Sequence, residues 1–417
     1  MSSRSLARLR SRWGAAPVGA PPTPPAPPTP AALTDADVVA FYEALLDRTP
    51  RPDEIALQLG NVETATALLQ VILASDEYAA RRAADAVAAA TPARPLVNVH
   101  TDDLAEFWAA PGTWSDDGVA VTGRDGWIFL GGGSNAILDQ YQGTVGPDEG
   151  FDAAWAAAMA ERREGAERLG AAFLGLIVPD KLPVLADLFP EPLPGIADVP
   201  AARLAARPEL GLLYPVAELA AVPGGAFLRT DTHLTYAGNA ALGQLVAEGL
   251  DARIPDDVLP GDMPLSRALH VGDLGRRYVP QLVEVTGKHH SWGRAQEVES
   301  NLDALFAVGG HVGTRTVMRN DTADDARTVV IFGDSYSLGN PAYAGLSWFL
   351  AHAFREVHFC WVPFGWDPDY AAAAGADVIV CEGAERFAIR PPDLRVDIHQ
   401  LAVDTITRLG GDAAAVS

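Results

Sequence analysis

Short apolar runs that alternate with helical stretches are the feature that most constrains the fold of this chain. Four such runs are bounded by turn or polar residues and are typical of buried strands: 174–179, 328–335, 356–363 and 377–383. Stretches with helical spacing of apolar residues occupy 148–170, 236–250 and 345–354. This alternation predicts an α/β fold with a mostly parallel sheet covered on both faces. In such sheets, ligands bind at the carboxyl ends of the strands.

The chain before residue 91 has a different character. Residues 1–33 carry basic residues followed by a Pro- and Ala-rich run, which predicts a disordered linker. Apolar side chains repeat at helical spacing over 34–90, which predicts a small all-α module. The run FYEALLDRTPRPDE followed by LLQVILASDEY resembles a short helical module often attached to enzymes that build surface polysaccharides. A helical cap or dimerisation element is the alternative. We expect the α/β domain over 115–410.

The strongly acidic character of the chain restricts its partners and its location. With 417 residues and a net charge of −23, its mean field repels nucleic-acid phosphates and anionic lipid surfaces. We therefore expect no nucleic-acid partner. The sequence shows neither a secretory h-region nor an apolar run of about 18 residues. From this we expect no transmembrane segment and a cytoplasmic location.

The cysteines, histidines and glycines give no signature of a metal or cofactor. Cys360 and Cys381 lie beside apolar runs, so we expect buried reduced thiols, with a bridge between them as the alternative. The Lys288–His290 cluster has no carboxylate partner, which favours a solvated turn over a metal site. Glycines 131–133 lack the spacing of a dinucleotide-binding loop. We predict no metal and no cofactor.

A serine stands directly after one predicted strand. In the run VVIFGDSYSLG, Gly333 permits a sharp turn that presents Ser335 at the sheet edge, which is how a nucleophile is exposed. The alternative is that Ser335 caps the helix that follows.

An aspartate and a histidine two residues apart precede the predicted helix 236–250. Imidazole titrates near neutrality and is the usual base for a serine, and a carboxylate can orient it. In extended backbone, Asp231 and His233 point the same way and can converge on one spot. The alternative is that Asp231 or Thr232 caps the helix and His233 is a surface residue.

Six segments in a fixed order give the chain a family resemblance. They are GRDGWIFL (123–130), IVPDK (177–181), DTHLTYAGNAAL (231–242), VGDLG (271–275), VVIFGDSYS (329–337) and EGAERF (382–387). The chain resembles the SGNH-type O-acetyltransferase domains of the AlgX and AlgJ alginate acetylation family over roughly residues 115–400. In that family, as here, the Asp-x-His element precedes the Gly-Asp-Ser element. The resemblance implies an SGNH-type three-layer fold.

The resemblance also implies roles for individual residues. Ser335 is expected to be the nucleophile, His233 the general base and then acid, and Asp231 its orienter. An acetyl-serine would form through an oxyanion held by backbone donors around Ser335 and Tyr336, and a sugar hydroxyl would then attack it. Tyr336 and Asn320 are candidates for the second oxyanion donor.

Other residues of the motifs carry further expectations. Leu234 stands where the family usually has an aromatic residue, and Tyr236 or Trp348 would replace that ring unless both lie in the core. Lys181 would bind an anionic donor or a uronate carboxylate, or else pair with Asp180 at the surface.

Two more motif positions are expected to be structural. Asp273 would fix its loop rather than take part in chemistry. Glu385 and Arg386 would form an ion pair with each other near the last strand.

These observations predict a carbohydrate O-acetyltransferase that acts on a polysaccharide or glycoconjugate. A carbohydrate esterase with the same site is one alternative, and a catalytically silent glycan-binding protein is another. The partners would be an acetyl donor, a sugar acceptor and, through the helical module, other glycan-assembly proteins. If the protein is cytoplasmic, a soluble thioester such as acetyl-CoA would be a suitable acetyl donor. The family resemblance makes a periplasmic or other extracytoplasmic location the alternative, in which a membrane acyltransferase would hand over the acetyl group.

Overall fold

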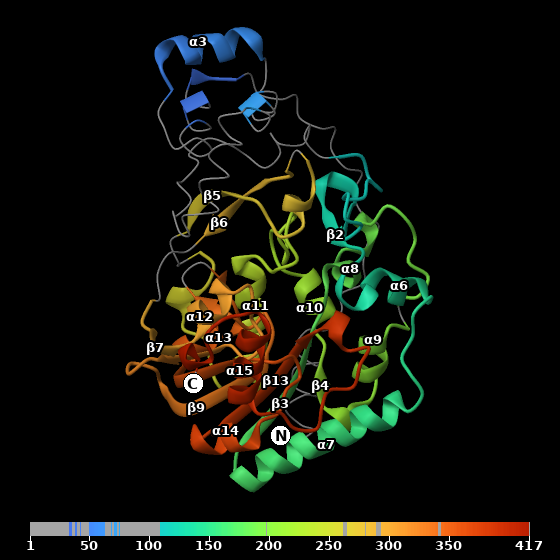
Figure 1. Cartoon of the computed structure of the whole chain (residues 1–417), viewed down its shortest axis with the longest axis vertical. Helices are drawn as coiled ribbons and strands as arrows, with labels where there is room; N and C mark the ends of the chain where they lie inside the picture. Colours follow the sequence, from blue (N-terminus) through green and yellow to red (C-terminus); the bar gives the residue numbers. More distant parts are fainter. Residues whose placement is uncertain are drawn as a thin grey trace.

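The computed structural model describes the chain in one long stretch and several short pieces. The long stretch is 109–416, with gaps at 197, 262–264, 280, 289–292 and 341–342. Before it, the structure describes residues 33–35, 38–39, 42, 50–62, 68, 71–72 and 75. The linker expected over 1–33 lies outside these residues except for Leu33, as do His289 and His290. Of the expected helical module, helix α3 (Pro52–Asn61) is described; it begins with Pro52 at its first position, where a missing N–H costs nothing (Figure 1).

A seven-stranded sheet with the order β4-β3-β13-β9-β12-β8-β7 forms the centre of the fold. Its strands are β3 (Ala172–Val178), β4 (Leu212–Leu213), β7 (Gln296–Ser300), β8 (Arg315–Arg319), β9 (Asp325–Gly333), β12 (Phe354–Trp361) and β13 (Val378–Ala384). The five strands from β4 to β12 are parallel, and β8 and β7 add an antiparallel edge. The predicted mixed α/β fold with a mostly parallel sheet is confirmed.

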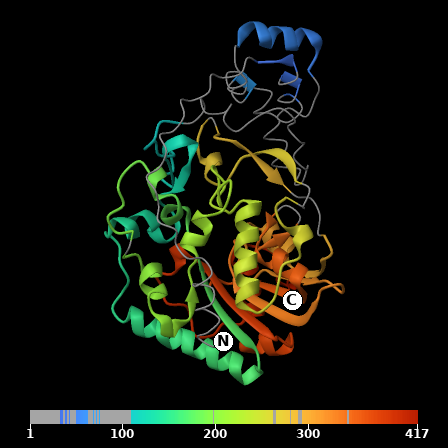
Figure 2. The same ribbon diagram turned by 180° about the vertical axis from the view of Figure 1, so that it is seen from behind.

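Helices cover both faces of the sheet, which explains why its central strands are apolar throughout. Helices α11 (Tyr236–Gly249) and α13 (Leu346–Ala353) pack on one face in the largest core cluster, against Val329 and Ile331 of β9. Helices α7 (Phe151–Leu169), α14 (Pro368–Ala373) and α15 (Ile398–Arg408) cover the other face. The long α7 runs along one end of the domain in both views (Figures 1 and 2).

The remaining described elements are short, and three hairpins are among them. The hairpins are β1 (Ala120–Thr122) with β2 (Ile128–Leu130), β5 (Ser266–His270) with β6 (Glu284–Lys288), and β10 (Gly339–Asn340) with β11 (Tyr343–Ala344). Short helices are α6 (Ile137–Gln142), α8 (Lys181–Val184), α9 (Pro200–Ala205), α10 (Val216–Ala220) and α12 (Leu302–Ala307). The hairpin β5–β6 lies apart from the main sheet, above α11 in the view of Figure 1.

The predicted elements agree closely with the observed ones. The four predicted strands correspond to β3, β9, β12 and β13, and the three predicted helices to α7, α11 and α13. The sequence analysis missed β4, β7 and β8. β4 and β7 are the two edge strands of the sheet, and β8 lies next to β7. β7 is exposed along its whole length, so it lacks the apolar run of a buried strand.

Candidate active site

Ser335 lies two residues beyond the end of β9, at the carboxyl edge of the parallel strands. The turn is fixed by the neighbouring Asp334, whose two carboxylate oxygens accept hydrogen bonds from Tyr336 N (3.0 Å) and Ala384 N (2.7 Å). A Cβ atom on Gly333 would clash with the side chains of Glu382 and Ser337, so glycine leaves room for both. The carboxyl end of β9 is therefore tied to that of β13.

The surroundings of Ser335 leave its polar atoms available. Within the part of the chain that the structure describes, neither its hydroxyl nor its backbone N–H hydrogen-bonds another protein group. The next helix, α13, begins after Gly345, so Ser335 caps no helix. Ser335 lines a cavity of about 60 Å³ together with His233, Asn239 and His270. The structure thus brings the predicted serine and histidine to one cavity.

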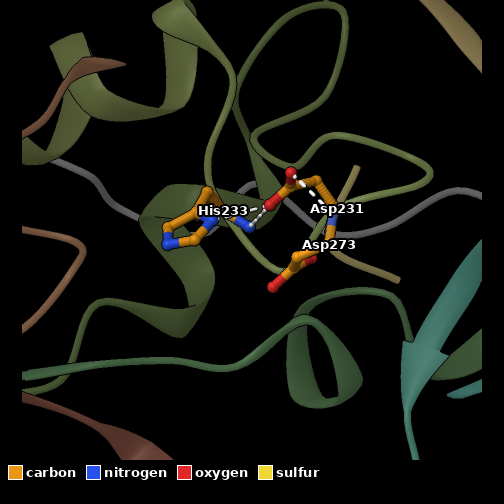
Figure 3. A group of neighbouring side chains, drawn as sticks. All are labelled: Asp231, His233 and Asp273. Atoms are coloured by element: carbon orange, nitrogen blue, oxygen red, sulfur yellow. Dashed lines mark hydrogen bonds and ion pairs between the residues drawn. The ribbon is translucent and has the colours of Figure 1, made fainter. Parts of the chain in front are cut away.

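His233 and Asp231 lie in the segment just before α11. His233 Nδ1 is 2.6 Å from Asp231 Oδ1, and the same oxygen accepts from the His233 backbone N–H at 3.0 Å (Figure 3). Thr235, not Asp231 or Thr232, caps α11, since its hydroxyl accepts from Gly238 N at 3.0 Å. Asp231 is therefore available to orient the imidazole.

Asp231 is buried and held in its ionised form by several donors. Besides the two contacts from His233, its Oδ2 accepts from Asp273 N at 3.1 Å and lies 3.0 Å from His270 Nε2. Burial raises the pKa of this carboxyl, but the hydrogen bonds and charges of His233 and His270 outweigh burial and bring the pKa well below its ordinary value.

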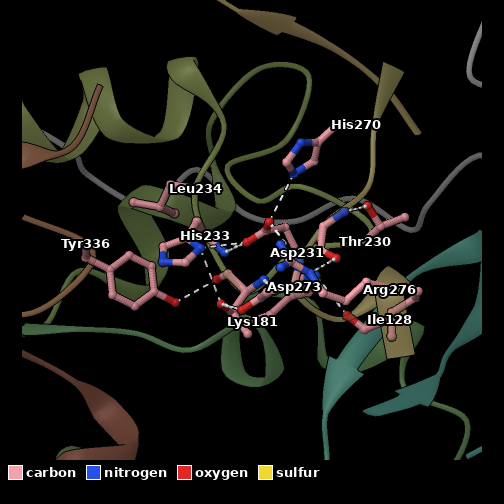
Figure 4. A network of polar contacts seen from close by, with 12 residues as sticks. Ile128, Lys181, Thr230, Asp231, His233, Leu234, His270, Asp273, Arg276 and Tyr336 are labelled. Carbon is pink, nitrogen blue, oxygen red and sulfur yellow. Dashed lines mark hydrogen bonds and ion pairs between the residues drawn. The ribbon is translucent and has the colours of Figure 1, made fainter. Parts of the chain in front are cut away.

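His270 is a member of the site that the sequence analysis missed. It ends β5, is buried, and binds the Asp231 oxygen that does not face His233 (Figure 4). The residues form a His–Asp–His chain in which Asp231 bridges two imidazoles. The sequence offered one signal, because His270 stands immediately before the VGDLG segment. Only the folding of the β5–β6 hairpin over the strand ends brings it to Asp231.

His270 gives a testable prediction as a positioning residue. We expect His270→Leu to slow acylation of Ser335 about tenfold, the cost of one hydrogen bond to a charged group. Because His233 would then be the one imidazole that shares the charge of Asp231, the pH midpoint of acylation should move upward. His270→Gln, which keeps an N–H donor, should restore most of the rate and the midpoint. Stopped-flow acylation by p-nitrophenyl acetate across pH would measure both. An unshifted midpoint in His270→Leu would contradict this role.

Asp273 fixes the loop around Asp231, as predicted. Its carboxylate accepts from Thr232 N (2.7 Å) and Thr232 Oγ1 (2.6 Å). A Cβ atom on Gly272 would clash with Thr230 O, so glycine lets this loop reach the Asp231 backbone.

The donor atoms of Asp231, His233 and Asp273 lie within 4.8 Å of one another, which is close enough for three metal ligands. Each of them already has a hydrogen-bond partner: Asp231 and His233 bind each other, and both Asp273 oxygens bind Thr232. The hydrogen bond between His233 and Asp231 gives this set the form of an oriented general base.

Tyr336 lies at the site but is already engaged by other partners. Its hydroxyl donates to Thr232 O at 2.8 Å, and its backbone N–H donates to Asp334 at 3.0 Å. Its ring centroid is 5.6 Å from that of His233. The expectation that Tyr336 donates to an oxyanion does not fit this arrangement, because both of its donors are engaged. It packs beside the histidine instead.

The expectation that Asn320 is an oxyanion donor is wrong. Asn320 follows β8, which runs antiparallel to β12, and its backbone N–H donates to Arg355 O at the start of β12. It therefore lies at the amino edge of the parallel strands, roughly 20 Å from Ser335 along the strand direction. Its buried side chain binds Ala351 O and Thr322.

Both expectations for Lys181 are wrong as well. The side chain is buried, and Nζ donates to Ile128 O (2.8 Å) and Arg229 O (3.1 Å), so it joins β2 to the segment before Asp231 (Figure 4). Burial lowers its pKa to about 8. Lys181 thus serves the backbone of the site, and it does not pair with Asp180.

Asp180 pairs with Arg386, so the predicted ion pair between Glu385 and Arg386 is wrong. Arg386 Nη1 is 2.5 Å from Asp180 Oδ1, and both side chains are buried. Glu385 accepts instead from the Tyr141 hydroxyl and, at 2.9 Å, from Asp180 N. Burial raises the pKa of Glu385 to about 8. These contacts tie the carboxyl ends of β3 and β13 together behind the site.

The remaining predicted positions lie in the core. Trp348 is buried and does not line the catalytic cavity around Ser335, so it does not replace the missing aromatic ring. Tyr236 is buried as well, and its hydroxyl donates to Val258 O, but it lines the catalytic cavity. Cys360 and Cys381 are buried free thiols, as expected. Among the residues that the structure describes, no helix combines the length and apolar character that a bilayer crossing requires.

Comparison with known proteins gives matches to solved structures alone. No protein-family model matches the chain, and no curated protein sequence does. The O-acetyltransferase domain of Pseudomonas putida AlgJ is 20% identical, with a TM-score of 0.42, and the match covers 69% of this chain and 99% of that one. Bacillus cereus PatB1 with a sulfonyl adduct is 12% identical, with a TM-score of 0.42, and the match covers 68% and 98%.

The third comparison is with AlgX from Pseudomonas aeruginosa. It is 14% identical, with a TM-score of 0.39, and the match covers 64% of this chain and 61% of that one. Likenesses of this size leave the function to be argued from the chain's own residues. The resemblance to AlgX and AlgJ domains that the sequence motifs predicted is thus also found when structures are compared.

Proposed function

We propose that the chain is a carbohydrate O-acetyltransferase that works through an acetyl-serine. One observation carries the proposal: Ser335 and His233 line the same cavity, and His233 Nδ1 lies 2.6 Å from the ionised Asp231. A hydroxyl and an oriented imidazole on one cavity are the groups that acyl transfer through a serine uses, which supports the proposal. The motif order that resembles the AlgX and AlgJ family supports a sugar as the acceptor.

The chemistry follows from the tautomer that Asp231 imposes. With the Nδ1 proton directed to Asp231, Nε2 of His233 carries the lone pair that takes the proton of Ser335. Ser335 Oγ attacks the acetyl carbonyl, the oxyanion collapses, and the donor leaves with the proton from His233. A sugar hydroxyl then gives its proton to His233, attacks the acetyl-serine and leaves as the ester, and Ser335 regains its proton. The Ser335 backbone N–H serves as one oxyanion donor.

An esterase is the second candidate function, because the same acetyl-serine can be attacked by water. The site chemistry is shared, so the two functions differ only in what enters the cavity. The glycan-binding alternative without catalysis predicts no adduct at all. The partners in the proposed reaction are an acetyl donor and a polysaccharide or glycoconjugate acceptor. The cytoplasmic location and its extracytoplasmic alternative both stay predictions.

Intact-protein mass spectrometry after mixing with p-nitrophenyl acetate tests this proposal. We expect a single acetyl adduct that a sugar acceptor discharges faster than water does. Discharge at the same rate with and without every sugar would favour the esterase. Absence of both an adduct and ester turnover would overturn the enzymatic proposal and favour the binding protein.

The pH dependence of acylation follows from the state of His233. Burial lowers the pKa of this imidazole, but its hydrogen bond to Asp231 and the charge of that carboxylate outweigh burial, so the pKa is raised. A base must be neutral to take a proton. We therefore expect the acylation rate to fall as the pH falls through a midpoint above the ordinary histidine value. A midpoint below that value, measured with p-nitrophenyl acetate, would contradict the assignment of His233 as the base.

A further inference from the structure

A buried glutamate on β13 holds the turn that carries Ser335. Glu382 is fully buried, and its Oε2 accepts hydrogen bonds from Asp334 N at 2.9 Å and from Ser337 Oγ at 2.6 Å. One of these donors stands directly before Ser335 and the other stands two residues after it. A single carboxyl oxygen therefore fixes the turn on both sides of the serine.

Asp334 binds β13 in the opposite direction. Its carboxyl group accepts from Ala384 N at the end of β13 and from Tyr336 N within the turn. Each of the two segments thus directs a carboxyl group to a backbone N–H of the other. This exchange surrounds the backbone of Ser335 and leaves its hydroxyl at the catalytic cavity.

The carboxyl groups of Glu382 and Asp334 lie together without a cation. Within the described part of the chain, neither forms an ion pair, and the buried Arg386 pairs with Asp180. Glu382 Oε1 is buried and has no hydrogen-bond partner among the described residues. A buried carboxylate with an unpaired oxygen beside a second carboxyl group is costly. A proton on Oε1 removes this charge and leaves Oε2 to accept from both of its donors.

The electrostatics of Glu382 agree with this geometry. Burial raises the pKa of its carboxyl group, and the charge of Asp334 raises the pKa further. The hydrogen bonds from Ser337 and from Asp334 N act in the opposite direction and are outweighed, so the pKa lies well above that of an ordinary glutamate.

The other titratable groups near these strand ends supply no counter-charge to Glu382. Asp180 and Arg386 bind each other, and Glu385 accepts from Asp180 N. His311, in the loop before β8, feels the charge of Asp334, but partial burial outweighs that charge and lowers the pKa of the imidazole. His311 is therefore mostly neutral at neutral pH.

We propose that Glu382 is a positioning residue for acyl transfer, which holds the Ser335 turn through Asp334 N while its carboxyl group is uncharged. The inference rests on the proposed transferase function. Ionisation of Glu382 would place like charges side by side in the core, and the turn would shift to relieve their repulsion. A nucleophile displaced by about 1 Å can react roughly 10²-fold more slowly. Acylation should therefore have an alkaline limit set by Glu382, in addition to the acid limit set by His233.

Stopped-flow acylation by p-nitrophenyl acetate across pH tests this role, with spontaneous hydrolysis subtracted and the adduct followed by mass spectrometry. In the wild type, we expect the rate to rise through the His233 midpoint and to fall again at alkaline pH. Glu382→Gln cannot ionise, and its amide oxygen can accept the same two hydrogen bonds. This variant should keep most of the neutral-pH rate and lose the alkaline fall. Glu382→Leu offers no acceptor and should acylate roughly 10²-fold more slowly at neutral pH.

Glu385→Gln is the matched control. Glu385 is also buried, and it also accepts from a backbone N–H and a hydroxyl, but these belong to Asp180 and Tyr141, outside the Ser335 turn. We expect Glu385→Gln to keep the alkaline fall, although burial raises the pKa of Glu385 to about 8. An alkaline fall that is absent in the wild type, or that persists in Glu382→Gln, would overturn the inference while leaving the transferase intact.

Urea unfolding across pH tests the uncharged state without relying on activity. A carboxyl group whose pKa is higher in the folded chain than in the unfolded chain contributes stability that is complete below the ordinary glutamate pKa. This contribution is lost as the pH rises through the higher value. The free energy of unfolding of the wild type should therefore fall with pH relative to that of Glu382→Gln. A constant difference between the two proteins would mean that Glu382 is charged in the fold, which contradicts the inference.

The two measurements separate the inference from the proposed function. If the wild type forms no adduct while the difference in unfolding free energy changes with pH, the transferase proposal fails and the positioning role fails with it. If the adduct forms and the difference is constant, the transferase proposal stands and the role of Glu382 is wrong.

Discussion

The Ser335→Ala variant is expected to form no acetyl adduct with p-nitrophenyl acetate and to lose ester turnover by roughly 10⁴-fold or more. The methyl group of alanine cannot attack a carbonyl, and His233 alone leaves only general-base attack by water. Because Ser335 makes no hydrogen bond to the described protein, the substitution should leave the free energy of unfolding nearly unchanged. Intact mass and urea unfolding measure the two quantities on the same sample.

Ser337→Ala is the matched control, two residues further along the same turn. Its hydroxyl donates to the buried Glu382 at 2.6 Å and does not line the catalytic cavity. We expect this variant to keep the adduct while losing about 1 kcal/mol of unfolding free energy, because Glu382 Oε2 loses one of its two donors and keeps Asp334 N. An adduct that persists in Ser335→Ala and disappears in Ser337→Ala would show that the nucleophile has been misassigned.

Asp231→Asn is expected to slow acylation by roughly 10³–10⁴-fold with the shape of the site preserved. An amide that presents its NH₂ group to His233 Nδ1 forces the imidazole into the tautomer with the proton on Nε2. That nitrogen then has no lone pair for the Ser335 proton. The loss should appear in the rate of adduct formation, and near-ultraviolet circular dichroism should report an intact fold.

Asp273→Asn tests whether any nearby carboxylate would have the same effect. Asp273 binds Thr232 and contacts Asp231 only through its backbone. In the variant, the amide oxygen can still accept from Thr232 N and the NH₂ group can donate to the Thr232 hydroxyl. We expect the acylation rate to fall by less than about tenfold. Equal losses in the two variants would mean that loop geometry, and not the charge on Asp231, sets the rate.

The sequence revealed those parts of the site that a short local segment encodes. Asp231 and His233 are two residues apart, and Ser335 follows an apolar strand, so local spacing was enough to single them out. The expectation for Asn320 failed because no local pattern indicates that β8 runs antiparallel, which carries its end to the opposite edge of the sheet. The expectations for Lys181 were wrong because a charged residue after a strand is usually exposed. Here the side chain is buried against the backbone carbonyls of Ile128 and Arg229.

The sequence alone determined the α/β class, the main strands and the residues that make up the proposed triad, because apolar periodicity and short-range spacing are local properties. Only the tertiary structure decided which groups surround that triad. His270 reaches Asp231 across 39 positions of the chain, and Arg386 reaches Asp180 across 206. Such pairings depend on how strands are ordered and how a hairpin folds over their ends. No local pattern encodes them.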